Sequence, residues 1–272
     1  MKPLEPESLD PFDLPVLDAA LAGSRFAGKL HFFPSIGSTN AYAMQQAEAG
    51  APDGSVYFAD EQTAGRGRGA HTWTSPPESG LYVSILLRPR IAPADILWLS
   101  LAAGLAVREA VRQVTTLDAD LRWPNDLLFG RKKFCGILTE LNAEVTRVRH
   151  AVIGIGINVH QSQFPEELRG IATSLQIETS RAWPRQQLLT ALLQSLDCEV
   201  AALAASSNPQ QFAHAMLTRL ASASSWIRGK RVRVEESEGF TGTTEGLDPR
   251  GFLLVRTAGG VRTVYSGGVR EG

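Results

Sequence analysis

Short apolar runs and alternating apolar residues mark the strands expected along this chain. They occur at Val56–Phe58, Leu81–Leu87 and Phe134–Leu141, and within Val145–Val159. The last of these segments is long enough for one strand or for part of a hairpin. The pattern therefore predicts several strands spread over the first 160 residues.

Apolar residues spaced three or four apart predict helices between and after these strands. Such helices are expected to begin at Pro93, near Pro184 and at Asn208-Pro209, where Pro suits the first helical turn. Another helix is expected after Ser38-Thr39-Asn40, because these residues favour the N-cap, and Gly50 provides its C-terminal stop.

The pattern changes after Ser225, where short strand-like segments alternate with Gly, Asp and Pro. Closely spaced short strands predict a small antiparallel barrel, with a hinge near Ser222–Ser225. The first 30 residues contain four prolines and one short apolar patch, so we expect a lead-in with one short helix. The predicted domains are thus 1–30, 31–222 and 226–272.

The composition of the chain excludes several classes of protein. The chain has 272 residues, 43% of them hydrophobic, and a net charge of -1, which argues against a general nucleic-acid binder or a polybasic membrane protein. Two cysteines form no disulfide framework, and the five histidines lack zinc-site spacing. No membrane span is expected, and the acidic N-terminus is unlike a signal peptide, so we expect a cytoplasmic protein.

The most unusual segment runs from Glu61 to Trp73 and contains Gly65-Arg66-Gly67-Arg68-Gly69. Glycine amides can approach a phosphate or carboxylate closely, and two guanidinium groups can bind it. The segment lacks the closing Gly-Lys-Ser/Thr of a P-loop. A solvated turn or an RNA-binding segment would also fit it, although RNA-binding Gly-Arg repeats recur and this one occurs once.

Two further segments contain turn-forming residues, or glycines that leave the backbone of a strand accessible. Arg122-Trp123-Pro124-Asn125-Asp126 reads as a turn with an amide and a carboxylate beside it, and Lys133 opens a strand in which Gly136 leaves room for a ligand. Gly154-Ile155-Gly156-Ile157-Asn158 has glycines within an apolar strand. Taken singly, both segments are also typical of structural turns and bulges.

In combination, five segments resemble the biotin–protein ligase family, of the monofunctional type without a DNA-binding domain. They are Ser38-Thr39-Asn40, Gly65-Arg66-Gly67-Arg68-Gly69, Arg122-Trp123-Pro124-Asn125-Asp126, Lys133-x-x-Gly136-Ile137-Leu138 and Gly154-x-Gly156-Ile157-Asn158. The resemblance covers about residues 31–272. It implies an α/β catalytic domain with a mixed sheet and a small C-terminal SH3-like β-barrel.

The resemblance also implies a reaction. Such ligases use ATP and Mg²⁺ to convert biotin to biotinyl-5'-AMP, and then transfer biotin to one lysine of a biotin carboxyl carrier protein, an acetyl-CoA carboxylase subunit. Mg²⁺ is expected to arrive with ATP rather than on protein ligands. We expect no DNA binding, and either a monomer or a homodimer.

Site residues follow by position. The biotin-binding residues implied are Ser38, Thr39, Asn40, Gln62, Arg66, Gly67, Arg68, Lys133 and Gly136, and the nucleotide-binding residues are Trp73, Asn125, Asp126 and Asn158. Lys133, Arg66 and Arg68 are the expected catalytic cations, because a fixed positive charge stabilises the attack of a carboxylate on a phosphate. His71 stands where many bacterial members have a third arginine, and the sequence leaves open whether it takes over the phosphate role of that arginine.

Two alternatives remain open. A lipoate or octanoyl transferase has the same fold, but would not explain Trp123-Pro124-Asn125-Asp126 beside the Gly-Arg segment. A catalytically inactive biotin-binding protein would not need Lys133, Arg66 and Arg68 together.

Overall fold

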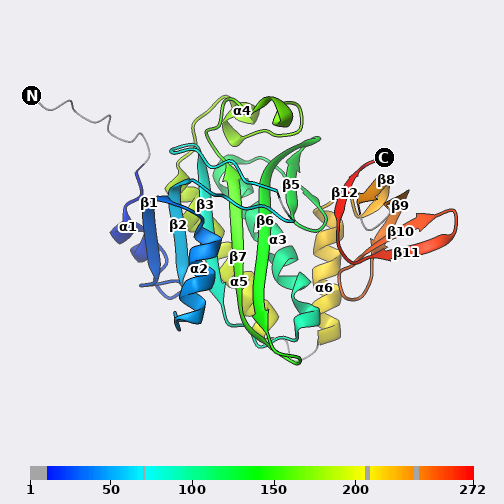
Figure 1. Ribbon diagram of the computed structural model, residues 1–272, viewed down its shortest axis with the longest axis horizontal. Helices are drawn as coiled ribbons and strands as arrows, with labels where there is room; N and C mark the ends of the chain where they lie inside the picture. The colour runs from blue at the N-terminus through cyan, green and yellow to red at the C-terminus, as the bar shows by residue number, and fades with distance from the viewer. Residues whose placement is uncertain (1–10, 70, 206–208, 236–238) are drawn as a thin grey trace, which may run out of the picture.

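The larger of two sheets forms the centre of the molecule (Figure 1). The computed structural model describes residues 11–69, 71–205, 209–235 and 239–272. This sheet has seven strands in the order β1-β2-β3-β7-β6-β5-β4, with β1 and β2 parallel and the other neighbours antiparallel. Its strands are β1 Leu30–Ile36, β2 Val56–Gln62, β3 Gly80–Leu87, β4 Asp120–Arg122, β5 Asp126–Phe129, β6 Lys132–Ala143 and β7 Val148–Asn158.

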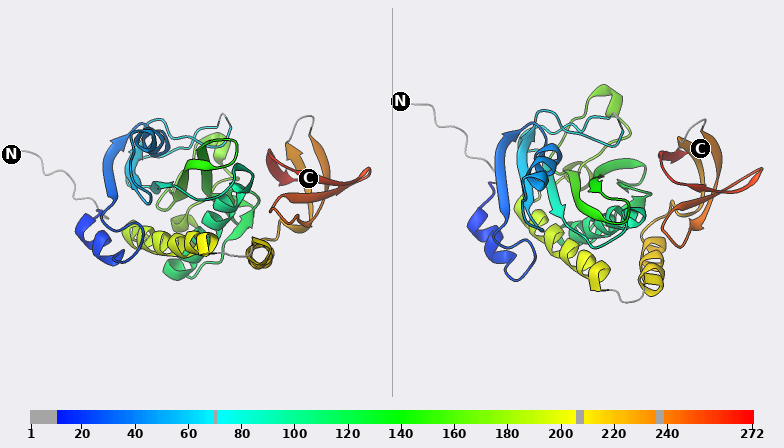
Figure 2. Two further views of the ribbon diagram at one scale, coloured as in Figure 1. Left: turned by 90° about the horizontal axis from the view of Figure 1, so that it is seen from below. Right: turned by 60° about the horizontal axis from the view of Figure 1, so that its bottom comes forward.

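Helices cover both faces of this sheet (Figures 1 and 2). On one face, α2 (Thr39–Glu48) packs Ala43 and Ala47 against Tyr57, Leu86 and Val152 of three strands. The opposite face carries α3 (Leu97–Thr115) and α5 (Arg185–Ala205), which enclose the main apolar core. Remaining helical elements are α1 Leu14–Ala20, the 3-10 turns Pro93–Asp95 and Glu166–Leu168, α4 Leu175–Thr179 and α6 Pro209–Ser222.

A second, five-stranded antiparallel sheet lies beside the first, in the order β11-β10-β9-β8-β12. Its strands are β8 Arg228–Glu235, β9 Phe240–Leu247, β10 Leu253–Thr257, β11 Gly260–Val264 and β12 Gly268–Glu271. The expected fold class, a mixed-sheet α/β domain with a small C-terminal antiparallel domain, is confirmed.

One apolar cluster joins the two sheets. It contains Leu101 of α3, Trp123 from the β4–β5 turn, and Val232 and Val255 of the second sheet. Trp123 also donates its indole N–H to the Gly251 carbonyl oxygen at 2.9 Å. Burial of shared apolar surface thus fixes the small domain against the large one.

The segment Ser222–Ser225, where a hinge is expected, lies along β4 and is hydrogen-bonded to it. The backbone N–H of Leu121 donates to the Ala223 carbonyl at 3.0 Å, and the N–H of Ser225 donates to the Asp120 carboxylate at 2.8 Å. The hydroxyls of Ser224 and Ser225 also find partners on this neighbouring strand, and the hinge itself stays a prediction. The low-complexity sequence of the segment did not reveal these partners.

The predicted helices and longer strands are confirmed, whereas β1, β4, β5 and β12 were missed. Pro34 interrupts the apolar pattern of β1, and this edge strand tolerates it. The other three strands have only three or four residues each, too few to display alternation. The proposed cap Asn208 lies outside the described residues.

The N-terminal lead-in forms the expected short helix, α1, but it is also part of the core. Leu17, Leu21 and Phe26 are buried in the main apolar cluster.

Among the described helices, only α5 is long and apolar enough to cross a membrane, as judged by its length and composition. Five of its leucines are buried in the core: Leu188, Leu189, Leu192, Leu193 and Leu196. This burial is typical of a core helix.

Candidate active site

A cavity of about 890 Å³ lies between the large sheet, the loop after β2 and the small domain. Every site residue expected from the sequence lines this one cavity, although these residues are up to 120 positions apart in the chain, from Ser38 to Asn158. They are Ser38, Thr39, Asn40, Gln62, Arg66, Gly67, Arg68, Trp73, Asn125, Asp126, Lys133, Gly136 and Asn158. The structure thus brings the five segments together.

Uncharged donors and acceptors gather at the start of α2. Ser38 caps this helix, and its hydroxyl accepts the Ala41 N–H at 3.5 Å. The side-chain carbonyl oxygen of Gln62 accepts hydrogen bonds from the backbone N–H of Thr39 at 2.9 Å and from the Thr39 hydroxyl at 3.0 Å. Ser84 of β3 lies with its hydroxyl 2.8 Å from the Thr39 hydroxyl and 2.6 Å from the Asn40 carbonyl oxygen. We call Thr39, Asn40, Gln62 and Ser84 the polar cluster.

Glycines of β6 and β7 form a bare floor beside the polar cluster. Gly136 pairs with Gly156, and two residues further along the strands Leu138 pairs with Gly154. A Cβ on Gly154 would collide with the Asn40 amide, and one on Gly156 would collide with the Trp73 indole. These side chains therefore rest directly on the backbone, which only glycine permits at this distance.

Trp73 lies across this floor near a cation. Its indole N–H is buried and has no hydrogen-bond partner among the described residues. The Lys133 ammonium lies 5.2 Å from the centre of the indole ring, within cation–π range. An orphaned buried donor is costly, so a ligand that accepts this hydrogen bond would be favoured here.

Three charges meet where the cavity faces β4 and β5. Asp126 binds Lys133 through one carboxylate oxygen and Arg122 through the other, each at 2.6 Å. Burial raises the pKa of Asp126, but Lys133 and Arg122 outweigh it, so this pKa lies below its usual range. The cluster holds one net positive charge, with Lys133 oriented over Gly136.

The small domain contributes to the same cavity. Arg68 donates from its guanidinium to the Gly267 carbonyl oxygen, between β11 and β12, at 3.0 Å. Burial lowers the pKa of Arg68, and the nearby charge of Asp126 opposes this. The Gly-Arg loop is therefore in contact with both domains, and His71 also lines the cavity.

Asn125 and Asn158 hold backbone segments in place. The Asn125 amide donates to the Ile137 carbonyl at 2.8 Å, which ties the β4–β5 turn to β6. The buried Asn158 donates to the Thr173 carbonyl at 2.9 Å, and so ties the end of β7 to the loop before α4. In this structure their amide N–H groups stabilise the walls of the cavity.

Sequence reasoning missed several lining or contacting residues, among them Ser84 and Glu140. Ser84 is a polar side chain within the apolar strand β3, and this is the signal that could have identified it, whereas Glu140 stands among other polar residues of β6 and gives no such signal. Trp226, Gly267 and Glu271 of the small domain also line the cavity. No local sequence feature connects them to it.

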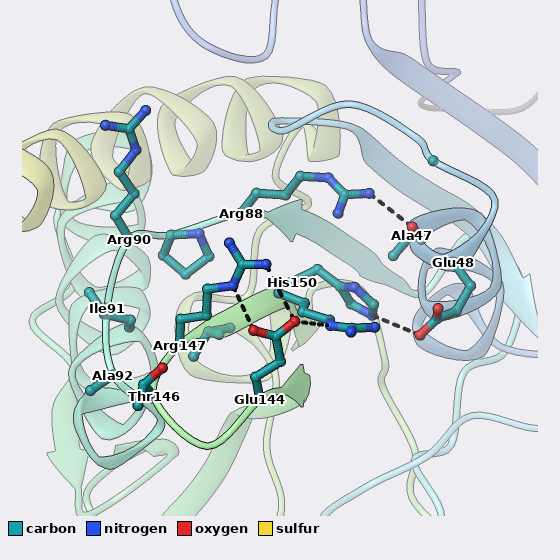
Figure 3. Close-up of a pocket in the computed structure, with 14 residues that line it drawn as sticks. Ala47, Glu48, Arg88, Arg90, Ile91, Ala92, Glu144, Thr146, Arg147 and His150 are labelled. Carbon is teal, nitrogen blue, oxygen red and sulfur yellow. Dashed lines mark hydrogen bonds and ion pairs between the residues drawn. The ribbon is translucent and has the colours of Figure 1, made fainter.

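A second hollow of about 760 Å³ lies at the other end of the sheet, beside the β6–β7 turn (Figure 3). Its charged groups largely satisfy one another. Arg147 and Arg149 both bind Glu144, at 2.9 Å each, and Arg88 donates to the carbonyl oxygens of Ala47 and Ala51 at the end of α2. None of the expected site residues lines it.

Across the described residues, no three His, Cys, Asp or Glu side chains come together as a metal-binding set. Asp126, the carboxylate nearest to Lys133, is already neutralised by two cations. The donor set therefore does not fit a resident metal ion.

Two family models match the chain. Residues 32–158 match the biotin/lipoate A/B protein ligase family, and residues 228–269 match the biotin protein ligase C-terminal domain. These two regions hold the larger sheet with its cavity and most of the second sheet.

Individual proteins agree with this match. The chain is 35% identical to the biotin–[acetyl-CoA-carboxylase] ligase of Mycobacterium tuberculosis, over 86% of this chain and 85% of that protein. It is also 35% identical to the bifunctional ligase/repressor BirA of Bacillus spizizenii, over 87% and 72%. The solved biotin protein ligase from Aquifex aeolicus in complex with biotin and ATP superposes with a TM-score of 0.77, at 31% identity, over 90% of this chain and all of that one. On this evidence, the chain belongs to the biotin protein ligase family of enzymes.

Proposed function

We propose that this protein activates biotin with ATP to form biotinyl-5'-AMP, and then transfers biotin to a specific lysine of a biotin carboxyl carrier protein. One observation carries the proposal: a single cavity holds an uncharged polar cluster beside the cations Arg66, Arg68 and Lys133. Biotin has a neutral cyclic urea at one end and a carboxylate at the other. The cavity is complementary to both ends, and the cations also suit phosphate.

The polar cluster supplies what a cyclic urea requires, which is hydrogen-bond acceptors for two N–H groups and a donor for one carbonyl oxygen. The biotin carboxylate would lie toward Lys133. The ammonium of Lys133 lies over Gly136, and Gly136 is two residues along β6 from Leu138, which is the residue level with Asn40. Two residues of a strand span about 7 Å. Trp73, which rests on Gly156, would lie beside the ligand and could donate its unpartnered indole N–H to it.

In the first step, a carboxylate oxygen of biotin attacks the α-phosphorus of ATP. A new P–O bond forms, the bond to the β-phosphate breaks, and pyrophosphate leaves. Lys133 stabilises the negative charge that develops between the carboxylate and the phosphate, and Arg66 and Arg68 of the Gly-Arg loop add positive charge. Asp126, which is itself bound by Arg122, holds Lys133 in position. Mg²⁺ enters as the complex with ATP and is part of the substrate.

In the second step, the lysine amine of the carrier attacks the acyl carbon of biotinyl-5'-AMP. A C–N bond forms, the C–O bond to AMP breaks, and the amine gives up a proton. The relative from Mycobacterium tuberculosis is called a biotin–[acetyl-CoA-carboxylase] ligase, which supports the carrier subunit of that carboxylase as the acceptor. We also propose a cytoplasmic location, and a role without DNA or membrane binding, as a monomer or a homodimer.

The test is incubation of the protein with ATP, Mg²⁺, labelled biotin and a carrier domain. Label on the carrier lysine supports the proposal, and a carrier in which that lysine is replaced by arginine should remain unlabelled. Transfer of a lipoyl or octanoyl group instead would favour the transferase of the same fold. Bound biotin with no adenylate formed would indicate an inactive binding protein.

A further inference from the structure

We infer that Glu140 is a positioning residue for biotin recognition: it fixes the orientation of the Asn40 amide in the polar cluster. This inference rests on the proposed function. Glu140 lies on β6, one hundred residues from Asn40, and its side chain is 25% exposed. It takes part in no sequence motif described above.

The two ends of the Asn40 side-chain amide face different kinds of partner. Its amide N–H₂ group faces β6, where it donates to the Glu140 carboxylate at 2.9 Å and lies 3.4 Å from the Leu138 carbonyl oxygen. Its carbonyl oxygen faces the Ser84 hydroxyl at 2.6 Å. The reversed amide would place its oxygen against a carboxylate and a carbonyl, both of which are acceptors and would repel it. Glu140 therefore makes the observed orientation the stable one.

This orientation determines what the polar cluster offers a ligand. The Thr39 hydroxyl donates to Gln62 at 3.0 Å, so its oxygen and the Asn40 carbonyl oxygen are both acceptors toward Ser84. The Ser84 hydroxyl has one proton and can satisfy only one of them at a time. The other acceptor remains available for a urea N–H group. A reversed Asn40 amide would present a donor there instead, and would lose that complementarity.

Glu140 also connects recognition to the loop that carries the catalytic cations. Its second carboxylate oxygen lies 3.4 Å from the Arg66 guanidinium, which is itself 55% exposed. An exposed ion pair at this distance contributes little by itself. Asn40 is only 4% exposed, so its hydrogen bond to Glu140 is buried. We expect this buried contact to determine the affinity for biotin.

The experiment measures the dissociation constant for biotin, without ATP, by titration calorimetry of the full chain. Glu140→Ala should weaken biotin binding about tenfold, because the Asn40 amide loses the partner that fixes it. Glu140→Gln should stay within about threefold of the wild type, since its carbonyl oxygen can still accept from Asn40. In steady-state assays, Glu140→Ala should raise the KM for biotin while the KM for ATP stays unchanged.

A matched control is Glu144→Ala. It removes a glutamate that lies in the β6–β7 turn and pairs with Arg147 and Arg149 at the second hollow (Figure 3). It should bind biotin as the wild type does. Wild-type affinity in Glu140→Ala, or an equal loss in Glu140→Gln, would overturn the inference. Failure of the wild type to bind biotin would instead refute the proposed function.

If Glu140→Ala does not fold, a second test exchanges the amide and the carboxylate between positions 40 and 140. Asn40→Asp alone places two carboxylates together and should abolish measurable biotin binding. In the double variant Asn40→Asp/Glu140→Gln, the glutamine amide can donate to the new carboxylate, so the hydrogen bond is restored with reversed direction. Binding should return in the double variant. If it remains absent there, the inference is wrong.

Discussion

The Lys133 ammonium lies 2.6 Å from the Asp126 carboxylate, at a point where β6 begins and the turn between β4 and β5 ends. Asp126 is also bound by Arg122, so one carboxylate orients two cations. A charge-assisted contact of this length restricts the position of the lysine before any substrate arrives.

Lys133→Ala should therefore retain the fold and slow adenylate formation about 10- to 100-fold, because charge-assisted contacts contribute about 1.5–3 kcal/mol each. The measurement is single-turnover formation of biotinyl-5'-AMP with saturating biotin and ATP. Lys132→Ala, an exposed neighbour on the same strand, is the control and should react normally. An unchanged rate in Lys133→Ala would remove this residue from the mechanism.

The Gly-Arg loop should become ordered when ligands bind. In the described part of Gly65–Trp73, the backbone hydrogen bonds are those from Gly67 to His71 at 2.8 Å and from Trp73 to Gly65 at 2.9 Å. Such a glycine-rich loop has high conformational entropy, which contacts with biotin and ATP must offset. Hydrogen exchange in this loop should be fast without ligands and slow with both. Equal protection in the two states would contradict the prediction.

Trp123→Phe should loosen the junction between the domains. It removes the indole N–H that donates to the Gly251 carbonyl, in a side chain that is 2% exposed, so the expected loss is about 1–3 kcal/mol in the free energy of unfolding. Urea denaturation followed by circular dichroism measures it. Trp183→Phe also loses an indole hydrogen bond, to the Thr179 hydroxyl, but at a more exposed position, and should cost less. Equal stability of Trp123→Phe and wild type would show that this hydrogen bond does not help to hold the domains together.

His150 should make the protein less stable in mild acid. Burial lowers the pKa of His150; Glu48 opposes this, and Arg88 and Arg149 add to it. Below pH about 6.5 the unfolded chain then binds more protons than the folded one, so stability falls as the pH decreases and is fully present above that value. Urea midpoints from pH 5 to 8 test this. His150→Asn should lose this contribution to the pH dependence, whereas the exposed His31→Asn should keep it.

DNA binding should be absent. Residues 1–30 contain three basic residues, Lys2, Arg25 and Lys29, against five acidic ones. A net negative segment gains nothing from phosphate contacts or counterion release. Fluorescence anisotropy with the upstream region of the gene, at moderate salt and with biotin and ATP present, should show no saturable binding. A sequence-dependent signal at submicromolar protein would contradict this expectation.

The sequence by itself determined the local features of this protein. Caps, turns and bare strands depend on side chains that are neighbours in the chain, so Ser38 at the start of α2, the glycines at 154 and 156 and the Gly-Arg loop were recognisable without coordinates. The same holds for the longer helices and strands, whose apolar spacing extends over several turns or pairs of residues.

Tertiary structure alone decided which of these features meet. Glu140 contacts Asn40, Ser84 contacts Thr39, and Arg68 contacts Gly267, and each pair is at least 45 residues apart in sequence. The order of the strands places these residues together, and that order depends on the packing of whole faces against α2, α3 and α5 rather than on any local segment. A hydrogen bond between distant residues leaves no local pattern in the sequence, because only the folded chain brings its donor and acceptor within reach.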